Sequence, residues 1–449
     1  MYRTAGELRE TAEQIWQAGV DAVRPEKLIR NAVRVNGSSL EVGEASIDLG
    51  SVGRIAVVGA GKAGAGMAAA LQDVLAEELL AEKRVTGWVN VPDDCVLALA
   101  PIHLHGARPA GVNEPTPAGV VGAEEILRLV GSLAAEDLCI CLISGGGSAL
   151  LPAPVEGISL EDKLAVTRHL SGAGANIQQL NTVRKQLSRI KGGRLAAACG
   201  AGRLIALIIS DVIGDPLDVI ASGPTVADPA TANDALAVLK QFQSAGHVPA
   251  GVFEYLERAD SIKTPASHCE VTNLVIGNNA TAVDAAGAEA VRQGLNPAIM
   301  AATELEGEAE GVGRHLAAMA LRMRDQPGPN CLIPGGEPVV RLAPPERRGD
   351  GGRNQQLVLA ACQELFDDGA AGIALLSGGT DGEDGPTDAA GAVLDADVIA
   401  AARRRGLSPG DFLERNDAYH FFEPLGGLLK TGPTGTNVCD LRVVVVSKG

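Results

Sequence analysis

One short apolar stretch that runs into a glycine-rich loop constrains the fold of this chain more than any other feature. Residues 139–143 read Cys-Ile-Cys-Leu-Ile, an uncharged run typical of a strand buried on both faces of a parallel sheet. The loop that follows, Ser144-Gly145-Gly146-Gly147-Ser148, cannot continue the strand, and its three glycines leave backbone N–H groups uncovered. The loop is therefore either a phosphate cradle at the carboxyl edge of an α/β sheet or a tight turn without a ligand.

A second strand end later in the chain has a similar glycine loop, but this one carries acids. The apolar run 373–376 is followed by Ser377-Gly378-Gly379-Thr380-Asp381-Gly382-Glu383-Asp384-Gly385. One loop that can wrap phosphate and another that can hold a metal ion are what a nucleotide-dependent enzyme needs, if the fold brings them together. We therefore interpret the two loops as parts of such a site.

The glycine turn nearer the amino terminus matches the G-x-G-x-x-G template of dinucleotide-binding folds. Residues 54–58 predict a strand, Gly59-Ala60-Gly61-Lys62-Ala63-Gly64 the turn, and the alanines and leucines that follow a helix. Taken alone, this pattern predicts NAD. Lys62 favours a different interpretation, because a lysine at a helix N-terminus can meet a phosphate directly; the alternative is a solvated side chain. The next predicted strand, 85–91, contains no acid for a ribose, and only two aspartates after it could serve.

Five cations lie within residues 184–194 of a chain whose net charge is −17. On a helix Arg184, Ser188 and Lys191 would share one face, since they lie four and then three residues apart. That face can meet an anion, or it can be a solvated or salt-bridged surface.

Acidic side chains follow several of the predicted strand ends. Asp211 and Asp215 come at the end of the apolar run 204–210, and Glu337 follows a glycine pair after a later strand. Aspartates beside glycine and proline at a strand end are suited to hold Mg²⁺ or to accept a proton from a hydroxyl, although single aspartates in turns mostly cap the backbone. Together with Asp381, these residues form the pool of predicted metal ligands and bases.

Arg353 opens a predicted helix directly after the charged, glycine-rich segment 347–352. A guanidinium at a helix N-terminus behind flexible glycines could reach a transferring phosphate; the alternative is an exposed surface arginine. No Gly-x-x-x-x-Gly-Lys-Ser/Thr motif occurs in the chain, so its phosphate chemistry is not that of a P-loop kinase.

The length and charge of the chain limit its class and its partners. Its 449 residues suffice for two α/β domains, and a net charge of −17 without a basic stripe argues against nucleic acid or an anionic membrane as a partner. No apolar run approaches ~18 residues, and no apolar signal core follows the first residues, which predicts a cytoplasmic protein. The eight cysteines are scattered and form no Cys/His cluster typical of zinc, so most should be reduced core residues.

The remaining pattern predicts how the elements are divided. The apolar spacing over residues 5–22 predicts a starting helix that packs on the outside of the first domain. We expect further strands over 97–104 and 339–342. The polar, helical stretch 226–265 is expected to bridge to a second domain.

Nine blocks of the sequence, in order from about Leu8 to the C-terminus and without a missing block, resemble the glycerate 2-kinases of the MOFRL family. They are Gly59–Ala63, Ser144–Ser148, Asn181–Lys185, Lys191–Gly193, Ser210–Asp215, Gly335–Glu337, Gly352–Gln355, Gly378–Gly382 and Gly432–Asn437. Any one of these motifs would be weak, but the ordered set is specific.

The resemblance implies an α/β enzyme of two domains, with residues 1–260 as a Rossmann-like three-layer sandwich and residues 261–449 as a smaller domain with a mixed sheet. Its active site would lie in the interdomain cleft, where the γ-phosphoryl group of ATP passes to the 2-hydroxyl of D-glycerate with Mg²⁺. Key residues proposed for the family match Lys62 and Arg353. Many relatives carry a His-Pro pair where this chain has Arg108-Pro109, so a contact assigned to that loop does not transfer.

The kinase hypothesis gives each candidate residue a role. Lys62 would contact the transferred phosphoryl group, Arg353 would stabilise its charge, and Asp211 would orient or deprotonate the attacking hydroxyl. The Ser144–Ser148 loop would cradle either the ATP phosphates or the glycerate carboxylate. The further candidates are Gly61, Arg184, Lys191 and Asn354 for ATP or substrate, and Asp215, Glu337 and Asp381 for the metal.

An NAD(P)H-dependent hydroxypyruvate reductase is the alternative, since family members have also carried that name and the Gly59–Gly64 fingerprint fits it. Such an enzyme would use a general acid, usually histidine, near a substrate-binding arginine. None of the seven histidines falls in a glycine-rich strand end, which weakens this hypothesis. A sugar- or nucleotide-sensing module ranks last, because simple binding does not require so many acidic turns. We expect a small-molecule substrate and a chain that could pair as a homodimer.

Overall fold

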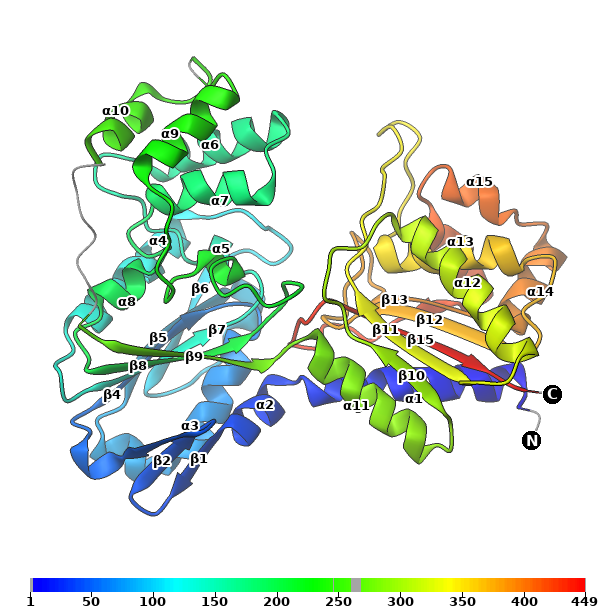
Figure 1. Cartoon of the computed structure of the whole chain (residues 1–449), viewed down its shortest axis with the longest axis horizontal. Helices are drawn as coiled ribbons and strands as arrows, with labels where there is room; N and C mark the ends of the chain where they lie inside the picture. The colour runs from blue at the N-terminus through cyan, green and yellow to red at the C-terminus, as the bar shows by residue number, and fades with distance from the viewer. Residues whose placement is uncertain (1–2, 245, 260–267, 449) are drawn as a thin grey trace. The chain divides into compact units, whose positions relative to one another are not determined.

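The computed structural model describes residues 3–244, 246–259 and 268–448, and these divide into two compact units (Figure 1). The first unit comprises Leu28–Ile209 and Asp215–Ile276. The second comprises the chain up to Lys27, the short piece Ser210–Gly214 and the chain from Gly277 onward. Within the described residues, no helix is both long and apolar enough to cross a membrane.

A sheet of mainly parallel strands forms the centre of the first unit. Its strands are β4 (Ile55–Ala60), β5 (Thr86–Pro92), β6 (Ile102–Arg108), β7 (Leu138–Ile143), β8 (Arg203–Ile209) and β9 (Glu270–Gly277), in the spatial order β6-β5-β4-β7-β8-β9. β4 pairs in parallel with both β5 and β7, so the order of the strands reverses between β4 and β7. This is the strand order of Rossmann-type folds, which bind ligands at the carboxyl ends of the strands where the order reverses. The Rossmann-like prediction for the first domain is confirmed.

Helices cover both faces of this sheet, as a three-layer sandwich requires (Figure 1). The helices of this part of the chain are α2 (Pro25–Ala32), α3 (Gly64–Glu82), α4 (Pro117–Gly131), α5 (Gly147–Leu150), α6 (Leu160–Gly172), α7 (Ile177–Gln186), α8 (Arg194–Ala198), α9 (Ala232–Gln241) and α10 (Ala250–Ala259). α3 packs on one face and α4 on the other, while α6, α7, α9 and α10 enclose an apolar core of their own (Figure 1). A small antiparallel sheet of β1 (Val33–Asn36), β2 (Ser39–Val42) and β3 (Ala45–Asp48) lies against α3.

A mixed sheet forms the centre of the second unit. Its strands are β10 (Pro297–Met300), β11 (Cys331–Gly336), β12 (Ile373–Gly379), β13 (Gly391–Leu394), β14 (Leu428–Leu429) and β15 (Asp440–Val446), in the spatial order β10-β11-β15-β12-β13-β14. β15 runs antiparallel to both neighbours, whereas β10 and β11 are parallel. The predicted α/β class with a mixed second sheet is confirmed.

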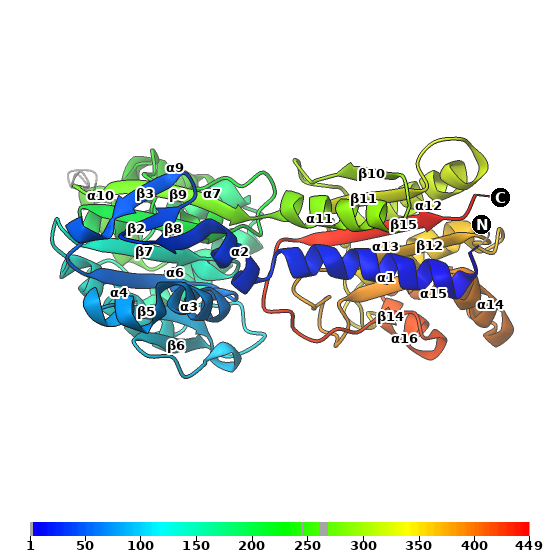
Figure 2. The ribbon, with the colours of Figure 1, turned by 90° about the horizontal axis from the view of Figure 1, so that it is seen from below.

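Helices also cover both faces of the mixed sheet. They are α1 (Ala5–Ala22), α11 (Asn279–Arg292), α12 (Ala309–Asp325), α13 (Arg353–Leu365), α14 (Ala396–Arg405), α15 (Pro409–Leu413) and α16 (Ala418–Phe422). α1 and α11 lie side by side on one face (Figure 2), and α12 and α13 pack together on the other. Trp16 of α1 is 1% exposed and its indole N–H donates to Gly378 O of β12 at 3.4 Å.

The place predicted for the starting helix was wrong. α1 forms where the periodicity predicts it, and a capping box in which Thr4 and Glu7 bond each other's backbone N–H begins it. However, its apolar face packs in the core of the second unit, with residues of α11, β12 and β15. The predicted domain boundary between residues 260 and 261 lies outside the described residues. The described part of the stretch expected to bridge the domains does not do so: α9 and α10 belong to the first unit and share an apolar core with α6 and α7.

Three local predictions also differ from the structure. The strand expected over 97–104 is β6, which runs further along the chain to Arg108. The strand expected over 339–342 is reduced to a single bridge between Val339 and Glu308. The helix that would carry Arg184 to Lys191 ends at Gln186, so these residues do not share a helical face.

Candidate functional site

Two of the glycine loops meet at the carboxyl ends of β4 and β7, where the strand order reverses. The backbone N–H of Lys62 donates to Gly145 O at 2.9 Å, and that of Ala63 donates to Ser144 Oγ at 3.0 Å. The approach is close because Gly61, with φ of +149°, has no side chain: a Cβ there would lie 2.0 Å from Ser144 Oγ. The structure therefore brings Lys62, Gly61 and the predicted cradle together.

Ser148, the last residue of the cradle, is the point at which two predicted cations converge. Arg184 Nη2 donates to Ser148 Oγ at 3.0 Å, and Lys191 Nζ donates to Ser148 Oγ and to Ser148 O, both at 2.8 Å. The two cations use both lone pairs of the hydroxyl, so its O–H donates to Ser222 Oγ, 2.9 Å away. Arg184 and Lys191 thus come together although the predicted helix does not join them.

The charges around Ser148 are not balanced by acids. Among the residues that the structure describes, no ion pair joins Arg184, Lys191 or the neighbouring Lys163 to a carboxylate. Burial lowers the pKa of Lys191 well below its usual value, and Arg184 and Lys163 lower it further. Burial likewise lowers the pKa of Lys163 to about 7, and its ammonium donates to Leu187 O at 2.8 Å. Lys191 is buried and Arg184 and Lys163 are half-buried. A group of such cations that forms no ion pair with the described acids is suited to an anionic ligand.

Arg353 is the first residue of α13 in the second unit, and its guanidinium holds two carboxylates. Nε and Nη2 donate to the two oxygens of Asp440 at 2.7 and 2.9 Å, and Nη1 donates to Glu337 Oε1 at 2.9 Å. Asp440 is fully buried, and the bidentate pair supplies both of its carboxylate oxygens with a hydrogen bond. Burial raises the pKa of Glu337, and Arg353 opposes that shift. Arg353 and Glu337, predicted from separate loops, are therefore direct neighbours.

Asn354 follows Arg353 in the same helix and is buried, with 1% of its surface exposed. Its Nδ2 donates to Asp384 Oδ1 at 3.3 Å, and its Oδ1 accepts from Ser377 Oγ at 2.5 Å. The amide nitrogen and the amide oxygen of Asn354 therefore both form hydrogen bonds within the protein. This geometry favours a structural role for Asn354, which holds the acid-bearing segment 377–385 (the acidic loop) in place. It does not favour the predicted contact of Asn354 with ATP or substrate.

The carboxylates predicted to bind a metal do not form a protein cage by themselves. Glu337 and Asp381 belong to the second unit and Asp215 to the first. Among the described residues, no group of three or more His, Cys, Asp or Glu side chains could hold a metal ion. Asp381 accepts from the backbone N–H of Glu383 at 3.1 Å, and its Oδ1 and that of Asp440 flank Gly379. Any ion held here would therefore need ligands from a substrate as well.

Asp211 lies in the short piece Ser210–Gly214, which belongs to the second unit. Its backbone carbonyl accepts from Cys439 Sγ at 3.1 Å, and the same thiol lies 3.9 Å from Glu337 Oε2. The structure thus brings the backbone of Asp211 to the group formed by Arg353, Glu337 and Asp440. The expectation of a site in the interdomain cleft stays a prediction.

Several residues at these loops were not chosen as site residues from the sequence. Ser222 stands directly before Gly223-Pro224-Thr225, a turn-forming sequence that was the available signal, whereas nothing in the sequence marks Lys163. Arg108 ends β6 and is buried; its Nη1 donates to Asn113 Oδ1 at 2.8 Å. Its Nη2 lies 3.0 Å from where a Cβ on Gly146 would stand, so Arg108 adds a cation beside the cradle.

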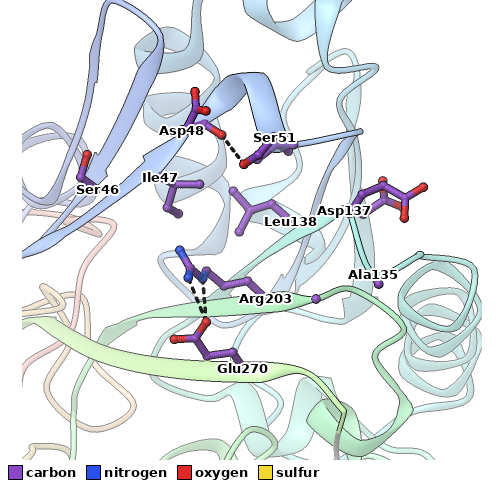
Figure 3. Close-up of a pocket in the computed structure, with 12 residues that line it drawn as sticks. Ser46, Ile47, Asp48, Ser51, Ala135, Asp137, Leu138, Arg203 and Glu270 are labelled. Carbon is purple, nitrogen blue, oxygen red and sulfur yellow. Dashed lines mark hydrogen bonds and ion pairs between the residues drawn. The ribbon is translucent and has the colours of Figure 1, made fainter.

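A cavity of about 420 Å³ lies at the other edge of the same sheet (Figure 3). Its lining comes from residues that precede β4, β7 and β8, including Ser51, Ala135 and Asp137, and from the small antiparallel sheet. Arg203 and Glu270 form an ion pair on its wall, with N and O 2.9 Å apart. Because the glycine loops follow the carboxyl ends of the strands, this cavity is separate from the candidate site.

Two sequence families match the chain. The family described as a domain of unknown function (DUF4147) matches residues 11–257. The MOFRL family matches residues 330–440.

Named relatives extend over most of the chain. Glycerate kinase of Rattus norvegicus is 37% identical and covers 98% of this chain and 93% of its own. D-glycerate 2-kinase of Thermotoga maritima is 36% identical and covers 98% of both chains. A protein of Agrobacterium vitis that carries a provisional name as hydroxypyruvate reductase is 40% identical and covers 88% of this chain and 100% of its own.

A solved structure has the same fold. The crystal structure of glycerate kinase from Thermotoga maritima superposes with a TM-score of 0.84 at 35% identity, and covers 98% of this chain and 100% of that one. The ordered motifs, both family matches and these full-length relatives agree. The chain belongs to the MOFRL-domain glycerate kinase family.

Proposed function

We propose that the protein is a glycerate 2-kinase, which transfers the γ-phosphoryl group of ATP to the 2-hydroxyl of D-glycerate. The observation that carries this proposal is the cluster of residues at the loops after β4 and β7. Lys62 lies beside the Ser144–Ser148 loop, and Arg184 and Lys191 both donate hydrogen bonds to Ser148 Oγ. The last two cations have no carboxylate partner among the described residues, which suits a polyanion such as a nucleotide phosphate. The names of relatives at 36–37% identity support the same activity.

The first unit would bind the phosphates of ATP. Rossmann-type sheets hold a pyrophosphate where the strand order reverses, and the Ser144–Ser148 loop follows β7 at that point. Arg184 and Lys191 fix the far end of this loop through Ser148. We assign Lys62 to the transferred phosphoryl group, because phosphoryl transfer depends mainly on positioned positive charge.

The second unit would complete the chemistry with Arg353 and Asp211. In the proposed reaction the 2-hydroxyl oxygen of glycerate attacks the γ-phosphorus and Asp211 accepts its proton, while the bond from the γ-phosphorus to the bridging oxygen breaks and ADP leaves. Arg353 would stabilise the negative charge on the transferred group. Its bidentate contact with Asp440 and its contact with Glu337 hold the guanidinium in a fixed orientation.

The carboxylates of the second unit fit Mg²⁺ in the way that a nucleotide-bound ion requires. Mg²⁺ in kinases is usually held by one or two carboxylates together with substrate phosphates, so a complete protein cage is not needed. Glu337 and Asp381 have the oxygen ligands that Mg²⁺ prefers, and Asp215 is a further candidate. When bound, the ion would neutralise charge on the β- and γ-phosphates.

Hydroxypyruvate reductase is the second candidate, favoured by the glycine fingerprint of β4 and by the name of the Agrobacterium vitis relative. Against it, β5 itself carries no acid, and only Asp93 and Asp94, which follow Pro92 at its end, could serve a ribose. Titration calorimetry with ATP and with NADH separates the candidates, since the kinase should bind ATP and not NADH.

A product assay tests the proposal. Purified protein with ATP, Mg²⁺ and D-glycerate should yield ADP and 2-phosphoglycerate. Formation of 3-phosphoglycerate would keep the kinase and overturn the choice of hydroxyl. Oxidation of NADH by hydroxypyruvate, with no phosphorylated product, would overturn the kinase. A cytoplasmic location and a homodimer, both expected from the sequence, belong to this proposal and are checked by fractionation and by light scattering.

A further inference from the structure

The helix that begins with Arg353 has no cap of its own. Gly352 stands at its N-cap position and supplies no side chain, while the first backbone N–H groups of any helix lack intrahelical acceptors. Asp384, from the acidic loop after β12, fills that place. Its Oδ1 accepts from Asn354 N at 3.0 Å and its Oδ2 accepts from Gln355 N at 2.8 Å. The carboxylate does from another loop what an N-cap side chain normally does from within the helix.

The glycine before the helix is explained by the same contact. A Cβ on Gly352 would lie 2.2 Å from both Cγ and Oδ1 of Asp384 and 2.4 Å from its backbone carbonyl carbon. The backbone of Gly352, at φ −125° and ψ −176°, is extended and open to any residue. Glycine is therefore required here by the space that Asp384 occupies and not by backbone conformation.

Asp384 is itself held firmly. It is 2% exposed, and its backbone carbonyl accepts from Gln355 Nε2 at 3.3 Å and from Thr387 Oγ1 at 2.9 Å. Asn354 Nδ2 adds a third donor to the carboxylate at 3.3 Å. The first turn of α13 thus donates to Asp384 from both backbone and side-chain groups, and the residue that precedes these amides is Arg353.

We infer that Asp384 is a positioning residue for Arg353, which it fixes by capping α13 from the acidic loop. The backbone of Arg353 is set by this cap, and its guanidinium is set by Asp440 and Glu337. The inference rests on the proposed function in taking Arg353 as part of the kinase site. The acidic loop also carries Asp381, so one bonded junction sets both the arginine and a proposed metal carboxylate.

The first test is Asp384→Asn, which keeps one acceptor but presents N–H groups to one of the two backbone donors. Misplacing a charged group such as the Arg353 guanidinium costs up to about 100-fold in rate. We therefore expect kcat for glycerate phosphorylation to fall about 10- to 100-fold, while KM for ATP stays within about threefold of the wild-type value. The matched control is Asp395→Asn. Asp395 is also 2% exposed in the second unit and caps α14 through Val398 N at 2.8 Å, but α14 carries no site residue. Its kcat should stay that of the wild type.

The second test reaches the same cap from the other side. Gly352→Ala is allowed by the backbone, and its methyl group would displace Asp384, so it should reproduce the kcat loss of Asp384→Asn. Gly311→Ala is the control, since nothing lies within 4 Å of a Cβ there. If both Asp384→Asn and Gly352→Ala fold and keep kcat within twofold of the wild type, the inference is overturned. It is also overturned if Asp395→Asn loses as much kcat as Asp384→Asn.

A measurement on the unaltered protein covers the case in which the variants do not fold. The capped amides of Asn354 and Gln355 should exchange their hydrogens at least about 100-fold more slowly than an unstructured peptide, although first-turn amides are ordinarily unprotected. Fast exchange at both would overturn the inference. Wild-type protein that fails to phosphorylate glycerate but protects these amides would overturn the proposed function and leave the cap in place.

Discussion

The hydroxyl group of Ser148 brings two cationic side chains of the first unit together. Ser148 accepts from two cations that lie 36 and 43 residues further along the chain, and it donates to Ser222. The sequence marks Ser148 as one end of a glycine loop and marks Arg184 and Lys191 as cations in an acidic chain. It does not reveal that these three residues touch, because contacts between distant loops depend on the whole sheet. The residue types of the candidate site were therefore predictable, but their partners were not.

Ser148→Ala removes the acceptor that the buried Lys191 and the half-buried Arg184 share. We expect KM for ATP to rise about tenfold or more, and unfolding free energy to fall by about 1–3 kcal/mol, because buried donors lose their partner. Steady-state kinetics and thermal unfolding check this. Ser171→Ala, at an exposed position of α6, should change neither. A normal KM for ATP in Ser148→Ala would contradict the assignment of this loop to the phosphates.

Lys62→Ala tests the assignment of the lysine in the first glycine turn. We expect kcat to fall by about 10³-fold, as for the loss of a charge that stabilises a transition state, while the fold persists because Lys62 lies in a turn. Circular dichroism and the product assay measure the two effects. Lys240→Ala, on the exposed face of α9, is the matched control. Near-normal turnover in Lys62→Ala would remove this residue from the mechanism.

At the scale of elements, the strand and glycine-loop units were the most predictable part of the fold. Each apolar run that meets a glycine turn became a buried strand, because such runs can only be satisfied inside a sheet. The helix expected to reach Lys191 failed. α7 ends at Gln186, and Ser188 then bonds the backbone N–H groups of Ile190 and Lys191, so side-chain bonding ends the helix where charge spacing alone would extend it.

Lys163, which lies near Arg184 and Lys191, should make the free energy of unfolding depend on pH. The pKa of Lys163 is lowered by burial to about 7 in the folded protein, against 10.5 as its ordinary value. Between these values the unfolded chain binds more protons, so folding stability rises with pH over this window. From pH 7 to pH 9, wild-type protein should gain about 1–2 kcal/mol relative to Lys163→Met. Calorimetric unfolding at both pH values measures the difference, and an equal response of both proteins would contradict it.

At the scale of the whole molecule, both fold classes were predictable but the partner of the first helix was not. Periodicity shows that one face of α1 is buried, and it cannot say which sheet covers that face. In the structure the covering sheet belongs to the second unit and begins only at Pro297, and Trp16 shares a core with residues of α11, β12 and β15.

Trp16→Ala should therefore weaken the second unit, although the residue lies near the beginning of the chain. Loss of a fully buried tryptophan costs about 3–5 kcal/mol. Hydrogen exchange should become faster in β12 and β15 while β4 and β7 keep their protection. Trp88→Ala, in the first unit, is the comparison. In that variant hydrogen exchange should become faster in β4 and β7, while β12 and β15 keep their protection. Faster exchange confined to β4 and β7 in Trp16→Ala would contradict the placement of α1.

The position of β15 in the mixed sheet has a consequence for how the chain is made. β15 is the last strand in sequence but lies between β11 and β12, and α1 is the first helix but packs on that same sheet. During translation, the ribosome releases α1 hundreds of residues before the strand that completes its binding surface. The β4 to β9 sheet can form while synthesis continues, whereas the apolar face of α1 gains its partners in steps, from α11, then from β12 and last from β15.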